Sequence, residues 1–348
     1  MTSLAPVGNP PAPPRRSGDP APQRRLGSVR RTASIDVNWR GGFADEKLLH
    51  GRARDLATDA SGATRVLAQA SMTATLAFDK TITALVANPA PARIGELIGQ
   101  RGGGHLRVVM AEIMPDFIAS GDPLYLLLDD ISGASLISVW AWSLWNPDWL
   151  RDIESLMPKE QLDKLTRAPD GVCWGLRPGN NHFSPESGHL ADEPADAGPV
   201  VNPGDPAGWH DFPELAGVSL RRARRIDVWR DATSGLIHID SAFQDSAPRP
   251  PRPDGTTAPR AAVHEYRLTA TLDPDTLALK SLAAVPYVLP FGECPGAVAG
   301  ALGLIGTPLR DIRETVLERL RGPAGCTHLN DALRALAEVP MLVEQLAG

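Results

Sequence analysis

The chain is short of cysteine and has no excess of positive charge. Only 3 of its 348 residues are cysteine, and the Cys-x-x-Cys pairs of a zinc ribbon are absent. A low, odd count also excludes the disulfide framework of a small secreted domain. With 35 basic and 41 acidic residues, the chain lacks the dominant basic face of a sequence-independent nucleic-acid binder. We therefore expect a reducing, cytoplasmic location and no nucleic-acid partner.

Long apolar segments are also missing. No apolar run approaches the ~20 residues that a membrane-spanning helix needs, so we expect no membrane partner. The N-terminal segment carries proline and arginine pairs where a secretory signal has an apolar core. Such a composition predicts a disordered tail, which we place at residues 1–28.

What the chain does contain is a weak internal repeat. Residues 30–37 read RRTASIDV and residues 221–228 read RRARRIDV. Further along, the sequence TATL occurs at residues 73–76 and again at residues 269–272. Because the order of the matches is kept, we interpret them as two copies of one unit that differ by insertions in loops.

Each copy begins with alternating, β-branched stretches and continues with helical spacing, which predicts an α+β fold. We expect two fused pseudo-repeats, each an antiparallel sheet with helices packed on one face. The copies are placed at residues 29–150 and 209–348, with a linker region at 151–208. Asp36 and Asp227 each follow an arginine pair, and we expect them to form cross-strand ion pairs.

Residues suited to chemistry gather in the second copy. Cys294 precedes a stretch of small residues, and Cys326, His328 and Asp331 lie at the predicted start of a helix. The dipole at a helix N-terminus favours a thiolate, which helps metal ligation and nucleophilic attack equally. The first copy has no matching polar cluster, so packing alone does not require one.

Three functions from different classes fit these residues. We expect a zinc or iron ion bound by Cys294, Cys326, His328 and His264, in a metal-dependent enzyme or an accessory protein of small-molecule metabolism. The first alternative is a metal-free enzyme for an acyl or thioester substrate, with Cys326 as nucleophile, His328 as base and Asp331 orienting the base. The second is a non-catalytic interaction protein, with a protein partner or a second copy of the chain.

Residues 263–336 resemble the NifU/IscU-type iron–sulfur scaffold fold. The resemblance rests on a β-hairpin, on Cys294-Pro-Gly-Ala, on Leu304-Ile-Gly-Thr-Pro-Leu-Arg-Asp, and on Cys326-Thr-His328 opening a late helix. It implies a NifU/IscU-like arrangement of sheet and helices, and it adds an iron–sulfur cluster as a cofactor ranked below a single metal ion. The first ligand cysteine of that family has no counterpart here, where His264 and Glu265 are the nearest polar residues.

From residue 28 onward the chain also resembles an uncharacterised bacterial family. The shared motifs are Arg-Arg-x-x-x-Ile-Asp-Val, Trp209-His210, the segment 263–266, Glu293-Cys294-Pro295 and the segment 326–331. This resemblance supports the motifs as a set and implies no activity.

Overall fold

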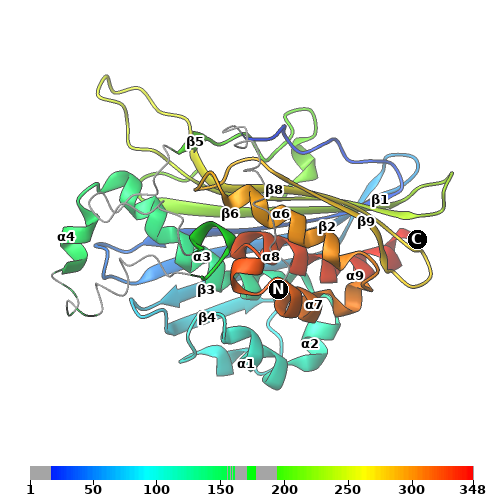
Figure 1. The fold of residues 1–348 in the computed structure, drawn as a ribbon, viewed down its shortest axis with the longest axis horizontal. Helices are drawn as coiled ribbons and strands as arrows, with labels where there is room; N and C mark the ends of the chain where they lie inside the picture. The colour runs from blue at the N-terminus through cyan, green and yellow to red at the C-terminus, as the bar shows by residue number, and fades with distance from the viewer. Residues whose placement is uncertain are drawn as a thin grey trace, which may run out of the picture.

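The computed structural model describes residues 17–154, 156, 158, 160, 171–177 and 194–347. Within these residues the chain forms one antiparallel sheet of nine strands (Figure 1). The order across the sheet is β4-β3-β2-β1-β6-β7-β8, and β8 then pairs with both β9 and β5. The strands are β1 (Ser28–Trp39), β2 (Lys47–Thr58), β3 (Thr64–Leu76), β4 (Ile82–Asn88), β5 (Ala195–Asp196), β6 (Ser219–Arg230), β7 (Ile237–Ala247), β8 (Ala261–Leu272) and β9 (Leu279–Pro286).

Strands β1 and β6 meet at the centre of the sheet, where the two halves of the chain join. Their antiparallel register places Arg30 opposite Asp227 and Asp36 opposite Arg221. Both pairs form ion pairs, at 2.5 Å from Arg30 Nε to Asp227 Oδ1 and 2.7 Å from Arg221 Nε to Asp36 Oδ1. The prediction that these aspartates form cross-strand ion pairs is confirmed.

Three helices pack against one face of the sheet (Figure 1). The longest, α3 (Pro123–Trp145), contacts β1, β2, β3 and β6, while α8 (Thr327–Arg334) lies on β7 and β8 and α9 (Val339–Glu344) lies on β1 and β6. The prediction of an α+β protein with an antiparallel sheet is confirmed.

The other helical segments are η1 (Ile94–Leu97), α1 (Leu106–Ile113), α2 (Pro115–Ala119), α4 (Trp149–Glu154), η2 (Trp174–Leu176), η3 (Pro206–Gly208), η4 (Cys294–Ala297), α6 (Val298–Ala301), η5 (Leu302–Leu304), η6 (Leu309–Asp311), α7 (Ile312–Arg319), η7 (Gly322–Ala324), η8 (Ala335–Glu338) and η9 (Gln345–Ala347).

Helix α3 corrects one expectation from the sequence. It is long and apolar enough to cross a membrane by length and composition, so the prediction that no such segment exists was wrong. The apolar sequence of α3 is interrupted by Asp129, Asp130 and several serines, so no uninterrupted apolar run in the sequence reaches the length of the helix. In the structure, 67% of its most apolar stretch is buried inside the protein, as expected of a core helix.

The opposite face of the central strands is also covered. His210 lies over β1, with its ring nitrogens 2.9 Å from the Thr32 hydroxyl and 2.7 Å from the Ser34 hydroxyl. Burial lowers the pKa of His210 to about 3. On this face Arg24 also forms an ion pair with Asp205, at 2.7 Å.

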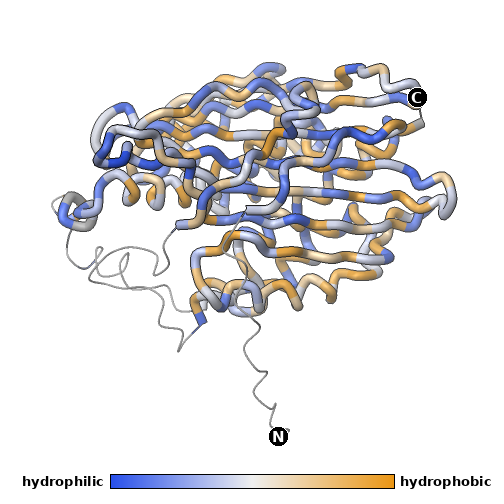
Figure 2. The backbone as a smooth tube through the Cα atoms, turned by 90° about the horizontal axis from the view of Figure 1, so that it is seen from above, coloured by the Kyte–Doolittle hydropathy of each residue, from blue (hydrophilic) through white to orange (hydrophobic). Residues whose placement is uncertain are grey.

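Seen from above, the long strands run side by side with hydrophilic and hydrophobic residues interspersed along them (Figure 2). Both kinds of residue are buried at the centre of the sheet, where Arg30 and Arg225 are as little exposed as Ile35 and Ile226.

Parts of the predicted tail and of the predicted linker contact the sheet. Of the predicted tail, residues 17–28 lie against the sheet, where Ser17 and Gly18 donate hydrogen bonds to Glu265; residues 1–16 lie outside the described residues. The predicted linker contributes the short strand β5, which pairs with β8. The division into two units stays a prediction.

A buried arginine ties helices and sheet together. Arg222, on β6, is 1% exposed. It binds both carboxylate oxygens of Asp245 on the neighbouring strand, at 2.9 and 3.0 Å. Its Nη1 atom also lies 3.2 Å from Asp130 on α3 and 3.3 Å from Asp331 on α8. Gly133 makes room for this contact, because a Cβ atom at that position would lie 1.8 Å from Arg222 Nη1.

Replacing Gly133 tests whether this network supports the fold. In an ordinary helix, Gly→Ala stabilises by up to about 1 kcal/mol. We predict the opposite sign for Gly133→Ala, a loss of about 2 kcal/mol in the free energy of unfolding, because the new methyl group displaces Arg222 from Asp130 and Asp331. Urea denaturation measures it, with Gly303→Ala as the control, since a Cβ there meets nothing within 4 Å. Equal effects of the two substitutions would contradict the prediction.

Candidate functional site

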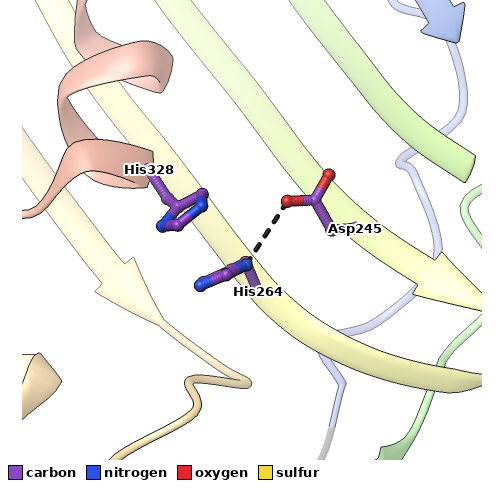
Figure 3. A group of neighbouring side chains, drawn as sticks. All are labelled: Asp245, His264 and His328. Atoms are coloured by element: carbon purple, nitrogen blue, oxygen red, sulfur yellow. Dashed lines mark ion pairs between the residues drawn. The ribbon is translucent and has the colours of Figure 1, made fainter. Parts of the chain in front are cut away.

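Asp245, His264 and His328 form a compact group at the junction of sheet and helices. Asp245 lies on β7, His264 on β8 and His328 in the first turn of α8 (Figure 3). One possible ligand atom from each residue lies within 4.8 Å of those of the other two. His264 Nδ1 is 3.3 Å from Asp245 Oδ2, and the two imidazole rings are stacked with centroids 3.4 Å apart.

Local structure explains why these three side chains meet. The register of β7 and β8 places Asp245 directly opposite His264, just before an irregularity at Asp245/Ser246. Directly opposite residues of an antiparallel pair project on the same face of the sheet. Helix α8 begins at Thr327 and contacts both strands, so its first turn brings His328 over the His264 ring.

The pKa values of both histidines are lowered, which favours their neutral forms at physiological pH. Burial lowers the pKa of His264, although the nearby Asp245 opposes that shift. Burial, reinforced by the neighbouring His264, holds the pKa of His328 well below its usual range. Burial would raise the pKa of Asp245, but the Arg222 guanidinium overcomes this and keeps the carboxyl ionised. Neutral imidazoles and an ionised carboxylate are the forms that bind metal ions.

His328 also lines a cleft of about 280 Å³ between α3 and the segment from α7 to α8. Asp331 lies in the same cleft, but arginines bind its carboxylate: Arg334 at 3.1 Å, Arg222 at 3.3 Å and Arg107 at 3.5 Å. The side-chain partners of Asp331 in the described part of the chain are these three arginines. Asp331 thus anchors α8 to the sheet, and its orientation of His328 in a thiol enzyme stays a prediction.

The cysteines lie around a different side chain, Tyr266. The Tyr266 hydroxyl donates a hydrogen bond to Cys326 Sγ at 3.4 Å. Burial, reinforced by the neighbouring Cys326, Cys294 and Cys173, holds the pKa of Tyr266 well above its usual range. Burial raises the pKa of both Cys294 and Cys326. These thiols are therefore protonated at neutral pH in the metal-free protein, which is unfavourable for a nucleophile.

The predicted ligands thus fall into two places. The structure brings His264 and His328 together, while neither Cys294 nor Cys326 belongs to a group of metal-ligating residues within 4.8 Å in the described part of the chain. Sequence reasoning missed Asp245, whose role depends on the pairing of β7 with β8. The sequence offers one signal that could have pointed to Asp245. Residues 237–247 alternate as a strand does, which places the Asp245 side chain on the same face as those of Phe243 and Ser241.

Thiol labelling tests the environment of the cysteines. We predict that iodoacetamide labels Cys294 and Cys326 more slowly than free glutathione at neutral pH, and rapidly after unfolding in urea, because burial blocks access and raises the thiol pKa. Cys173 is less buried and should react before the other two in the native protein. Peptide mass spectrometry follows each site. Fast native labelling of Cys326 would instead favour the thiol-enzyme alternative.

Comparison with known protein families gives a match over part of the chain. Residues 220–342 match the family described as Protein of unknown function (DUF2889), which agrees with the expected resemblance to an uncharacterised family. No curated protein and no solved structure matches the chain, so the NifU/IscU resemblance stays a prediction. The matched segment runs from β6 into α9 and carries Asp245, His264 and His328, so the candidate site lies in the part of the chain that is similar to this family of unknown function.

Proposed function

We propose that this protein binds one zinc or iron ion through Asp245, His264 and His328, and that the bound metal serves a reaction or binding step on a small molecule in the adjoining cleft. The observation that carries the proposal is the convergence of three ligand atoms, from β7, β8 and α8, within 4.8 Å of one another. Two imidazoles and one carboxylate are a donor set that suits both metals.

A three-residue set favours a functional site over a purely structural one. Structural zinc sites use four protein ligands, whereas catalytic sites keep at least one position for water or substrate. His328 is one wall of the cleft, so open positions on the metal would face the space that a small molecule can enter. A metal held there would polarise a substrate oxygen or activate a bound water.

Two features of the group bear on metal binding. Arg222 occupies both oxygens of Asp245, but each carboxylate oxygen has a further lone pair, and ligating carboxylates are commonly hydrogen-bonded in this way. The two rings are inclined by only 20°, so one must turn before a metal can lie in the plane of both. His328 sits at the start of α8 and lines the cleft, so we expect its ring to be the one that turns.

The other half of the sheet provides an internal comparison. There Arg31 binds Asp55 at 2.6 Å, as Arg222 binds Asp245 in the second half. The residue opposite Asp55 on β3 is Ala68, where His264 stands opposite Asp245. The arginine–aspartate pair is thus common to both halves and the histidine is an addition in the second. We infer from the paired registers that the two halves are copies of one unit.

Metal analysis of matched variants tests the proposal. We predict about one zinc or iron per chain in the purified, metal-reconstituted protein, as expected for a single protein-bound ion. His328→Gln should lose at least about tenfold in metal affinity, while the control His238→Gln, whose ring stacks on Trp229 away from the site, should keep it. Cys326→Ser should also keep its metal.

The opposite pattern would contradict the proposal. A wild-type protein that stays metal-free after reconstitution, with its fold intact by circular dichroism, excludes this site. Loss of metal in Cys326→Ser with retention in His328→Gln would return the metal to the cysteines.

A further inference from the structure

The cleft beside His328 has an apolar wall that faces solvent. Leu136 on α3 and Leu317 on α7 are each 51% exposed, and Val172 is 46% exposed. All three line this one cleft, although they come from three separate parts of the chain. Exposed apolar side chains that converge on a concave site mark a ligand or partner surface more often than scattered ones do.

Among the described residues, the same cleft and the ion-pair network beneath it together carry one more positive than negative charge. Beneath it, the arginines Arg107, Arg222, Arg224 and Arg334 interlock with the aspartates Asp129, Asp130, Asp245 and Asp331, four charges of each sign. Arg321 lies at the rim as a fifth arginine. Its exposed guanidinium has no hydrogen-bond or ion-pair partner in the described part of the chain. The planar fork of arginine matches a carboxylate or phosphate in two-point contact.

We propose that the cleft binds a small amphiphilic anion, with its carboxylate or phosphate at Arg321 and its alkyl part against Leu136, Val172 and Leu317. The Thr327 hydroxyl, which also lines the cleft, is a further donor for the head group. As a statement about substrate, the inference rests on the proposed function, because His328 and its metal would face the bound molecule. As a statement about binding, it stands on the cleft alone.

Calorimetric titration of the full chain separates the two ends of the ligand. The probes are octanoate and octyl phosphate, which have both features, acetate, which has the head group alone, and 1-octanol, which has the tail alone. We expect octanoate or octyl phosphate to bind at least about tenfold more tightly than acetate or 1-octanol, because neither end alone satisfies both walls. The difference in affinity between octyl phosphate and octanoate shows which head group the cleft prefers. Equal affinity for the amphiphile and for either half-probe would overturn the inference.

Matched variants locate the binding. Arg321→Gln should weaken octanoate or octyl phosphate about tenfold or more through loss of a charged hydrogen bond, whereas Arg310→Gln, on an arginine exposed outside the cleft, should not. Leu317→Gln should weaken binding of the amphiphile roughly fivefold through lost apolar contact, against Leu302→Gln as a similarly exposed control outside the cleft. An equal loss of affinity in each variant and its control would overturn the assignment of binding to this cleft.

The outcomes for metal and anion are separable. Amphiphile binding in a protein that proves metal-free supports this inference and removes the proposed function. Metal binding without amphiphile binding retains the proposed function and overturns this inference.

Discussion

The buried guanidinium of Arg222 is the constraint on which the centre of this molecule depends. Removing a charge from water costs several kcal/mol unless carboxylates surround it with good geometry. Three elements meet that need: β7 supplies Asp245, α3 supplies Asp130 and α8 supplies Asp331. Each contact holds one element at a set place against β6, and a glycine in α3 makes the space for it. In the first half of the sheet Arg31 has the same position, bound to Asp55 and, at 2.6 Å, to Glu338 from the other half.

The candidate site follows from this network. Arg222 keeps Asp245 ionised, so His264 on the next strand lies beside a charged carboxylate. Because Asp331 is held by three arginines, α8 is pinned at its first turns, and His328 lies over the His264 ring. The residues nearest to chemistry are thus positioned by groups that play no part in it. Substitutions in the network will disturb fold and site together, which is why the variants that test function are at His328, Cys326 and Arg321.

Much of the fold could be predicted from local pattern. Alternating stretches predicted strands at the start of each copy, and the two RRxxxIDV segments lie on β1 and β6. The helix start predicted around Cys326, His328 and Asp331 agrees with the start of α8 at Thr327. Strand β2 is hard to recognise in the sequence, because charged and small residues such as Arg52, Arg54 and Asp55 break up its apolar alternation. Those polar residues are tolerated there because partners on neighbouring strands pair with them, which only the register reveals.

The site was only half predictable, for a geometric reason. Cys326 and His328 are close in sequence, but Cys326 is the N-cap of α8 and His328 lies in its first turn. Residues two apart on a helix point in different directions, so the thiol meets Tyr266 while the imidazole meets His264. Asp245 became visible only once β7 and β8 were paired.

X-ray absorption spectroscopy at the zinc edge, on the reconstituted full chain, tests the central claim most directly because it reports the ligand atoms themselves. The account predicts a shell of nitrogen and oxygen ligands at about 2.0–2.1 Å with imidazole scattering and no sulfur. A sulfur shell at about 2.3 Å would show that Cys294 or Cys326 binds the metal, and would contradict the assignment to Asp245, His264 and His328.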